Sequence, residues 1–288
     1  MTLLDEITST ITSVATKIGP SVVGINRHGT GFVVSDGFVV TNAHNLRDDG
    51  VVTFADGRVA IGRSAGVDLD GDLAVLAVDT AGVPPVEWAT TPAALGDVVV
   101  ALSNPRGRGL RATLGTISST GRGFRGPRGR RIPGSIEHTA PLARGSSGGP
   151  VLDREGRALG VNTNRLQEGF YQAIAATDEI VKRISELSKG NTPTRRRLGT
   201  ALAPPQVARR LREAAGLSEV EGLLVRGVEE GSAAERAELR RGDVLTSAGG
   251  TPLTSIDALY EVLDGEGGQI EFTVMRADEE LKVVVSFD

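Results

Sequence analysis

Residues 143–152, A-R-G-S-S-G-G-P-V-L, decide how the rest of this 288-residue chain is interpreted. Two adjacent serines, Ser146 and Ser147, stand between glycines, and a proline and an apolar run follow. Such a segment is either a plain turn or the site of a nucleophilic serine. The glycines would let the amides of Gly145 and Ser147 point at one developing oxyanion. A nucleophilic serine also needs a histidine to take its proton and a carboxylate to orient that histidine.

The positions of the histidines restrict the kind of serine site. Residues 145–149 match G-x-S-x-G, the nucleophile elbow of α/β-hydrolases, in which a helix follows the serine and the histidine lies further along the chain. Here residues 151–161 read as two short strands around a turn, and all three histidines precede Ser147: His28, His44 and His138. The elbow interpretation is therefore rejected. The order His, Asp, Ser is that of the chymotrypsin-type double barrel.

His44 and Asp72 are the candidates for base and orienting acid. His44 lies in T-N-A-H-N-L, directly after an apolar segment, where an imidazole would stand at a barrel rim. Asp72 opens the apolar run D-L-A-V-L-A-V, and a carboxylate there needs a hydrogen-bond donor such as a histidine Nδ1–H. Asp68 and Asp70 compete for the same role, and Asp72 is favoured because it alone borders the apolar strand.

Composition excludes several function classes. The net charge of −4 implies no general attraction to nucleic acid or acidic membranes, and the absence of Cys excludes disulfides and thiolate chemistry. No apolar run approaches the roughly 20 residues that span a bilayer. The N-terminus lacks the basic start and apolar core of a signal peptide. If Met1 is the native start, a cytoplasmic location is expected; if an anchor has been removed, the periplasm or cell envelope is the alternative.

The apolar pattern predicts a β-rich first domain preceded by a helix. Short apolar runs separated by Asp-Gly and other turn signals fill residues 21–176, which is typical of an all-β barrel or sandwich. Before them, apolar residues at spacings of three and four form one face of a helix: Leu4, Ile7, Ile11, Val14 and Ile18. That face would dock on its own domain or, alternatively, contact another subunit.

The character of the sequence changes after a second helical pattern at residues 177–188. Residues 189–197, K-G-N-T-P-T-R-R-R, read as a linker without periodicity. Beyond it, helical and strand patterns mix, which predicts a second, α+β domain of roughly 90 residues. Its helix candidates are 204–215, 232–239 and 255–263.

The blocks that carry the candidate site resemble the HtrA (Deg) family of serine proteases. They are G-T-G-F-V-V-S-D-G-F-V-V-T-N-A-H (29–44), G-D-L-A-V-L (71–76) and G-S-S-G-G-P-V-L (145–152), and residues 222–253 resemble the PDZ domain of that family. The resemblance implies a mainly β fold: a chymotrypsin-like double six-stranded β-barrel over 1–190 with its N-terminal helix, a linker at 191–197 and a smaller α+β PDZ domain over 198–288. It also implies a homotrimer.

The same resemblance assigns roles residue by residue. His44 would be the general base, Asp72 its orienting acid and Ser147 the nucleophile, with the Gly145 and Ser147 amides as the oxyanion hole. Ser146 would be only a neighbour. The substrate pocket would draw on Leu142, Tyr171 and Ala173, whose apolar character suggests small or medium aliphatic substrate side chains. The PDZ carboxylate-binding nest would be Leu198, Gly199 and Thr200.

Three residues depart from the family pattern. Thr139 stands where relatives have Asp, and Arg144 where many have Pro; both lie in the segment that shapes the oxyanion loop. Arg197 replaces the usual aromatic residue before the nest. The implied function is a serine endopeptidase that cleaves unfolded or exposed polypeptides through an acyl-enzyme in protein quality control, without metal or cofactor, while the PDZ domain binds C-terminal peptides. The alternative is a peptide-binding chaperone or scaffold whose protease domain its loops hold inactive.

An arginine-rich stretch at residues 122–131 remains open. It is interpreted as a solvated loop, with two alternatives: a regulatory loop that contacts the PDZ domain or a neighbouring subunit, and a nucleic-acid contact. Phe124 is its only aromatic residue, so base stacking has little support and no nucleic-acid partner is predicted. The G-x-G-x-x-G match at 121–126 is not followed by a helix, which argues against nucleotide binding. A calcium loop starting at Asp68 is rejected because Leu73 stands where the loop requires glycine.

Overall fold

The computed structural model describes residues 2–46, 49–126, 129–166, 169–193 and 195–287. The chain divides into two compact units, residues 1–193 and 194–288. Each unit is described by itself below. No helix among the described residues is long and apolar enough to cross a membrane.

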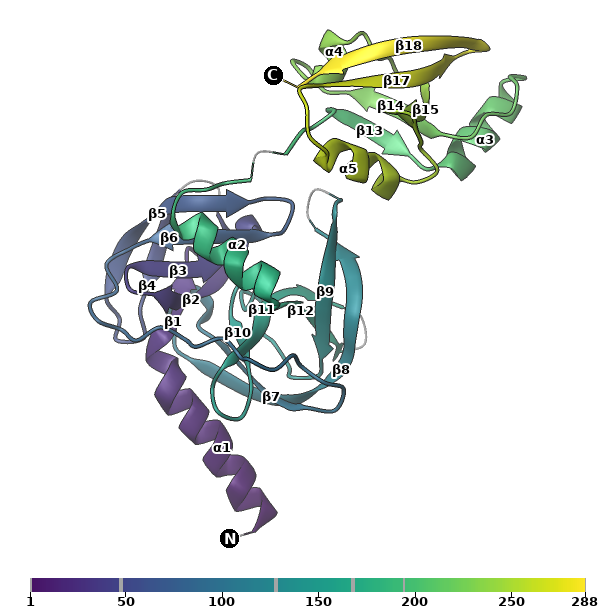
Figure 1. The fold of residues 1–288 in the computed structure, drawn as a ribbon. Coiled ribbons are helices and arrows are strands. Elements are labelled where there is room, and N and C mark those ends of the chain that lie inside the picture. Colours follow the sequence, from purple (N-terminus) through teal and green to yellow (C-terminus); the bar gives the residue numbers. More distant parts are fainter. Residues whose placement is uncertain (1, 47–48, 127–128, 167–168, 194, 288) are drawn as a thin grey trace. The chain divides into compact units, whose positions relative to one another are not determined.

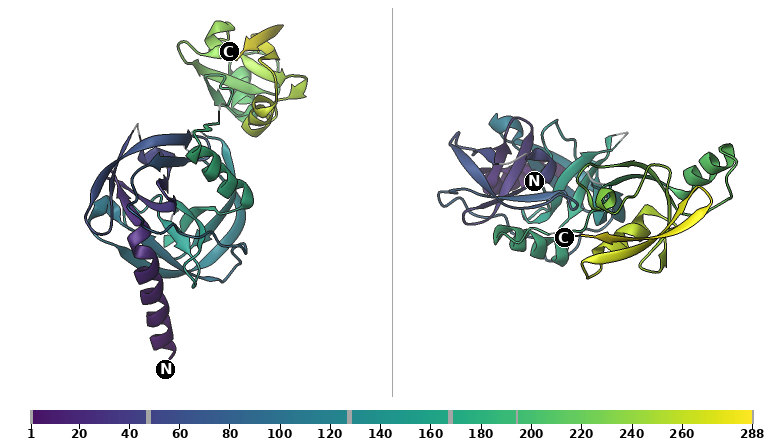
Figure 2. Two further views of the ribbon diagram at one scale, coloured as in Figure 1. Left: turned by 60° about the vertical axis from the view of Figure 1, so that its left-hand side comes forward. Right: turned by 90° about the horizontal axis from the view of Figure 1, so that it is seen from above.

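An amphipathic helix, α1 (Leu3–Ile18), precedes the first strand. It begins at a capping box, in which Thr2 Oγ1 accepts from the Asp5 amide while the Asp5 carboxylate accepts from the Thr2 amide. Only the end of the helix is buried, at Val14 and Ile18, whereas Leu3 and Leu4 are exposed. The start of α1 therefore extends away from the barrels (Figures 1 and 2).

The first barrel is a closed antiparallel sheet with the strand order β1-β2-β3-β6-β5-β4. Its interior is filled by apolar side chains that alternate along the strands with outward-facing ones, as a small closed barrel requires. Closure leaves the barrel without an unpaired edge. The strands are β1 (Val22–Ile25), β2 (Gly29–Ser35), β3 (Phe38–Thr41), β4 (Gly50–Thr53), β5 (Val59–Asp68) and β6 (Leu73–Ala77).

The second barrel is closed in the order β10-β11-β12-β9-β8-β7. An apolar cluster joins the two barrels, with Phe32 from the first and Leu102 and Val161 from the second. Helix α2 (Asp178–Ser188), which begins at the Thr177 cap, packs Leu187 into the same cluster. The strands are β7 (Val98–Ser103), β8 (Arg111–Arg125), β9 (Arg131–His138), β10 (Pro150–Leu152), β11 (Ala158–Arg165) and β12 (Tyr171–Ala175). The predicted double six-stranded barrel is confirmed.

The arginine-rich stretch belongs to the second barrel. Strands β8 and β9 form a long hairpin, so residues 122–125 and 131 of the expected solvated loop are strand residues (Figure 1). At the tip the Gly126 amide donates to the Arg130 carbonyl at 2.8 Å. Phe124 packs against the core, which explains why the hairpin is held to the barrel. Arg128 of the predicted loop lies outside the described residues.

The second unit is an antiparallel sheet in the order β13-β14-β15-β17-β18, with β16 paired to β15. Its strands are β13 (Thr200–Ala203), β14 (Leu223–Val228), β15 (Val244–Ala248), β16 (Thr251–Pro252), β17 (Gln269–Arg276) and β18 (Glu279–Ser286). Its helices are α3 (Pro205–Ala214), α4 (Ala233–Arg236) and α5 (Ile256–Asp264). The α+β class is as predicted, but α4 ends three residues before the predicted bound of 239, where Glu238 has a left-handed backbone (φ 57°).

Part of the predicted linker packs on this second unit. Arg196 donates hydrogen bonds to the carbonyls of Val262, Leu263 and Gly267 at 3.1, 2.9 and 2.7 Å, and to that of Gly265. These carbonyls lie at and just beyond the C-terminal end of α5, where the last carbonyl groups of a helix lack intrahelical donors. The guanidinium therefore acts as a C-terminal cap for α5.

Candidate active site

His44 lies in a short 3₁₀ turn, residues 43–45, directly after β3. The preceding Asn42 is fully buried and donates its side-chain amide to the Asp72 carbonyl at 3.0 Å. This bond ties the histidine turn to the segment between β5 and β6. The imidazole is thereby presented at the rim of the first barrel, as its place after an apolar strand predicts.

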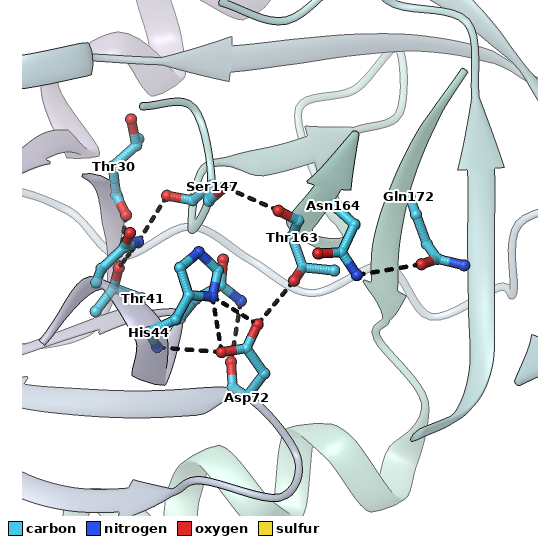
Figure 3. Close-up of polar contacts among 10 residues, drawn as sticks. Thr30, Thr41, His44, Asp72, Ser147, Thr163, Asn164 and Gln172 are labelled. Carbon is cyan, nitrogen blue, oxygen red and sulfur yellow. Dashed lines mark hydrogen bonds and ion pairs between the residues drawn. The ribbon is translucent and has the colours of Figure 1, made fainter. Parts of the chain in front are cut away.

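Asp72 is buried beside His44, with 1% of its side chain exposed. Both carboxylate oxygens lie 2.9 Å from His44 Nδ1, and Oδ1 also accepts from the His44 amide at 3.2 Å (Figure 3). Because a carboxylate accepts hydrogen bonds, in the neutral imidazole Nδ1 carries the proton and Nε2 is left as an acceptor. The histidine is therefore in the tautomer that a general base requires.

Thr163 is a further hydrogen-bond donor to Asp72, and it was not predicted from the sequence. The pairing of β11 with β12 shifts between Asn162 and Asn164, so Thr163 sits in a bulge. A bulge re-aims a side chain, and here the Thr163 hydroxyl donates to Asp72 Oδ2 at 2.7 Å. The only signal was the polar run Asn162, Thr163 and Asn164 at the end of an apolar strand.

Ser147 stands in the turn before β10 and is held from the first barrel. Its carbonyl accepts from the Thr30 amide and from Asn45 Nδ2, both at 2.9 Å. Its hydroxyl donates to the Thr163 carbonyl at 2.8 Å rather than to His44 (Figure 3). His44 and Ser147 therefore lie on neighbouring segments that hydrogen bonds hold in place, and no hydrogen bond joins their side chains in this structure.

The candidate oxyanion loop around Ser147 depends on its glycines. Gly145 and Gly148 adopt φ angles of 89° and 90°, which residues with a side chain rarely adopt. A Cβ on Gly148 would lie 2.0 Å from the Thr30 carbonyl oxygen. Within the described part of the chain the Gly145 and Ser147 amides have no hydrogen-bond acceptor, so both remain available to an oxyanion. Thr30 Oγ1 fixes the loop by donating to the Gly145 carbonyl at 2.7 Å.

The two serines have different surroundings. Ser146 is buried and its hydroxyl donates to Ser103 Oγ at 3.0 Å, whereas Ser147 is partly exposed. Thr139 holds its own segment, since its hydroxyl accepts from the Thr116 amide at 3.0 Å. Arg144 is exposed beside the serines.

A cavity of about 240 Å³ opens next to Ser147. Leu142 and Tyr171 line it as expected, but Ala173 does not: its side chain is fully buried in an apolar cluster of the second barrel. The lining is also more polar than predicted, because the four residues at the bulged end of β11, 162–165, contribute to it. The full lining is Leu142, Ala143, Arg144, Gly145, Ser146, Ser147, Asn162, Thr163, Asn164, Arg165 and Tyr171.

His138 lies behind this cavity and is fully buried. Its ring stacks on Tyr171 with centroids 5.9 Å apart, and its Nε2 lies 2.8 Å from Asn162 Oδ1. Asn162 Nδ2 donates to the Gly149 carbonyl at 3.1 Å, so Oδ1 is the acceptor and His138 Nε2 carries the proton. Nδ1 has no partner among the described residues. Burial lowers the pKa of His138 despite the opposing hydrogen bond to Asn162.

The other two carboxylates of D-L-D-G-D do not approach His44. Asp68 accepts from the Gly71 amide at 2.9 Å and lies 3.7 Å from Arg183 Nε of α2. Asp70 pairs with Arg130 Nε at 3.2 Å. No cluster of His, Asp and Glu that could hold a metal ion occurs among the described residues. His28, the remaining histidine, is exposed.

The predicted peptide-binding nest lies at the start of the edge strand β13. Leu198 and Gly199 are fixed through their carbonyls, which accept from the Ala234 and Glu229 amides, both at 2.8 Å. Gly199 has a φ of 79°. Thr200 begins β13, which among the described strands pairs with β14 alone, so its other edge is available for strand addition. Arg197 at the aromatic position pairs with Glu229 at 3.1 Å.

The double barrel with the His44, Asp72 and Ser147 cluster, and the α+β unit that follows it, define a trypsin-like peptidase domain followed by a PDZ domain. Family models agree: a trypsin-like peptidase domain matches residues 29–161 and a PDZ domain matches residues 224–276. The putative serine protease HhoA of Synechocystis sp. is 32% identical over 276 residues, covering 89% of this chain and 69% of that protein. The chain therefore belongs to the HtrA/Deg family of serine proteases.

Other relatives agree with this placement. A probable periplasmic serine endoprotease, DegP-like, of Chlamydia trachomatis serovar D is 33% identical over 268 residues, which is 90% of this chain but 53% of that protein. The chain thus spans about half the length of that relative. A serine endoprotease from Yersinia pestis is similar in structure, with 25% identity, a TM-score of 0.68 and 96% coverage of both chains. The HtrA-type protease AlgW with a decapeptide has the same fold, with 23% identity, a TM-score of 0.69, and 96% and 97% coverage.

Proposed function

We propose that this protein is a serine endopeptidase in which Ser147 is the nucleophile, His44 the general base and Asp72 the orienting acid. The observation that carries the proposal is the His44–Asp72 pair, whose geometry leaves Nε2 as an acceptor on the segment that also binds the Ser147 carbonyl. A structural histidine would not need a buried carboxylate with a third donor, Thr163, behind it.

The reaction follows from these contacts. The Ser147 hydroxyl rotates from the Thr163 carbonyl toward His44 Nε2, which takes its proton as Oγ attacks the substrate carbonyl. The Asp72 carboxylate stabilises the imidazolium, and the Gly145 and Ser147 amides stabilise the oxyanion. His44 then protonates the leaving amine, which leaves an acyl-enzyme. Water, deprotonated by His44, hydrolyses that ester and regenerates the hydroxyl of Ser147.

The substrate class is an extended polypeptide. The cavity beside Ser147 accepts one side chain, and its mixed lining replaces the apolar pocket expected from the sequence. The free edge of β13 would take the C-terminus of a bound peptide, with its carboxylate at Leu198, Gly199 and Thr200. The HtrA-type protease AlgW with a decapeptide supports peptide binding in this fold. Unfolded proteins, which expose such segments, are the proposed substrates in protein quality control.

Location and assembly are part of the same proposal. The DegP-like relative is described as periplasmic, which favours the envelope over the cytoplasm. A homotrimer is proposed through the start of α1, where Leu3 and Leu4 are exposed. Clustering exposed apolar side chains in an assembly would remove them from water.

The test is active-site labelling with a fluorophosphonate probe on the full chain. Labelling that is lost in Ser147→Ala and retained in Ser146→Ala supports the proposal, since only the former removes the nucleophile. The Ser146→Ala variant is the control for damage to the loop. Absence of Ser147-dependent labelling, with correctly folded protein, would refute it.

A second candidate function is a chaperone or scaffold with an inactive protease. The hydrogen bond from the Ser147 hydroxyl to Thr163 favours it, because the attacking group does not face the base. Labelling with and without a C-terminal peptide distinguishes the candidates. Labelling that needs the peptide indicates a triggered protease, and none in either condition indicates a scaffold.

A further inference from the structure

Arg130 differs from its neighbours in the arginine-rich hairpin. Arg122, Arg125 and Arg131 are exposed, whereas Arg130, at the tip between β8 and β9, keeps 5% of its side chain exposed. A guanidinium loses its hydration on burial, so it is stable only beside a compensating group. The sequence run of arginines does not indicate which member is buried.

The compensating group is on the segment that bears the catalytic acid. Arg130 Nε lies 3.2 Å from Asp70 Oδ2, and 11% of the Asp70 side chain is exposed. The backbones are also in contact, because a Cβ on Gly126 would lie 2.6 Å from the Asp70 carbonyl oxygen. A hairpin of the second barrel therefore rests on the β5–β6 connection of the first, two residues before Asp72.

That connection needs support from outside. Asp72 has a φ of 54°, a left-handed conformation that Asp adopts more often than most residues with a Cβ, although it costs free energy relative to the right-handed region. Such a conformation persists only where surrounding contacts determine it. The connection is held by Asn42 at the Asp72 carbonyl, by Arg183 of α2 at Asp68 and by Arg130 of the hairpin at Asp70. Of the two ion pairs, the one at Arg130 is shorter and closer in sequence to Asp72.

We propose that Arg130 is a positioning residue for the catalytic acid. Its ion pair with Asp70 holds the β5–β6 connection so that the Asp72 carboxylate meets His44 Nδ1 at 2.9 Å. The inference rests on the roles proposed above for His44 and Asp72. It makes the catalytic pair of the first barrel depend on a hairpin of the second barrel.

The test compares Arg130→Met with Arg131→Met in the full chain. Both remove one arginine charge and keep an unbranched stem, but only Arg130 pairs with Asp70. We expect Arg130→Met to lower kcat on the order of 10- to 100-fold, as sub-ångström to ångström misplacement of catalytic groups does, with KM changed less than about threefold. Arg131→Met should resemble the wild type in both constants.

Asp70→Asn and the double variant Arg130→Met/Asp70→Asn complete a double-mutant cycle. If the ion pair is the cause, Asp70→Asn gives a similar loss and the double variant loses no more than either single variant. The double variant removes both charges of this ion pair, so it remains informative if Arg130→Met folds poorly. Independent losses that multiply in the double variant, or a wild-type kcat in Arg130→Met, would overturn the inference.

A readout without turnover separates this inference from the proposed protease activity. The Nδ1 proton of His44 is observed by NMR in protein labelled at histidine nitrogen and assigned with His44→Ala. Its exchange with water should accelerate about tenfold or more in Arg130→Met and not in Arg131→Met, because a displaced Asp72 shields it less. If the wild type shows no Ser147-dependent labelling, the proposed activity fails, and the proton exchange still decides the role of Arg130.

Discussion

Thr163→Val tests how much the catalytic pair depends on the bulge in β11. Valine keeps the shape of threonine and keeps the backbone carbonyl that accepts from Ser147, but it removes the hydroxyl that donates to Asp72 Oδ2. The carboxylate then retains only the two donors of His44 on its side-chain oxygens. Nothing else in the described contacts of Thr163 changes.

The magnitude follows from the burial of Asp72. A hydrogen bond to a charged group contributes about 1.5–3 kcal/mol, and 1% exposure leaves little water to replace it. For a unit of this size, about 2 kcal/mol lowers Tm by roughly 4–8 °C. Because Oδ2 is then free to turn away from His44 Nδ1, we also expect kcat/KM to fall on the order of 10- to 100-fold. This range corresponds to a tenfold loss for each ~1.36 kcal/mol of lost transition-state stabilisation.

The assays are calorimetric unfolding and hydrolysis of an unstructured protein substrate. Thr163→Ser is the matched control, since serine retains the hydroxyl and should keep kcat/KM within about threefold of the wild type, the hydrogen bond being intact. A Thr163→Val protein that matches Thr163→Ser in both Tm and kcat/KM would falsify the argument. The Thr163 hydroxyl would then be dispensable to the pair.

Three further outcomes are expected. The free energy of unfolding of the first unit should fall as pH drops below about 6.5, by up to about 1.4 kcal/mol per pH unit. The cause is that the histidine in the unfolded chain binds a proton that buried His138 binds only at lower pH. Above about pH 6.5 the imidazole is neutral in both states, so it contributes nothing to this dependence. His138→Gln should flatten this dependence in urea titrations at several pH values, and an unchanged slope would contradict it. Gly148→Ala should cost more than about 1 kcal/mol and abolish labelling, because its Cβ meets the Thr30 carbonyl at 2.0 Å, and a wild-type Tm would contradict this. Amidating the C-terminus of a peptide that binds the PDZ unit should weaken calorimetric affinity at least about tenfold, since the Gly199 nest loses a carboxylate, and equal affinities would place binding elsewhere.

The barrels and the candidate triad could be predicted from the sequence because both follow local rules. Apolar runs with turn signals between them indicate closed β structure, and a polar residue at the boundary of such a run stands at a barrel rim. His44 and Asp72 satisfy this rule. The order along the chain, with Ser147 last, then excludes the α/β-hydrolase alternative.

What could not be predicted depends on contacts between distant segments. Thr163 acts through a bulge, and a register shift leaves no mark in an alternating pattern. Arg130 differs from the next arginine in being buried against Asp70, some sixty residues earlier in the sequence. Ala173 was misplaced because alternation gives the face of a strand but not how far along it the cavity extends.

The hydrogen bond from the Ser147 hydroxyl to the Thr163 carbonyl can reduce the reactivity of this serine only by a limited factor. Leaving it takes a rotation about a single side-chain bond, which occurs in picoseconds to nanoseconds. A neutral hydrogen bond contributes about 0.5–1.5 kcal/mol, so breaking it reduces the reactive population by roughly tenfold at most. A stronger silencing of the protein needs a change other than this rotation, such as a displaced Asp72 or a peptide plane in residues 142–147 that turns an amide away from the oxyanion.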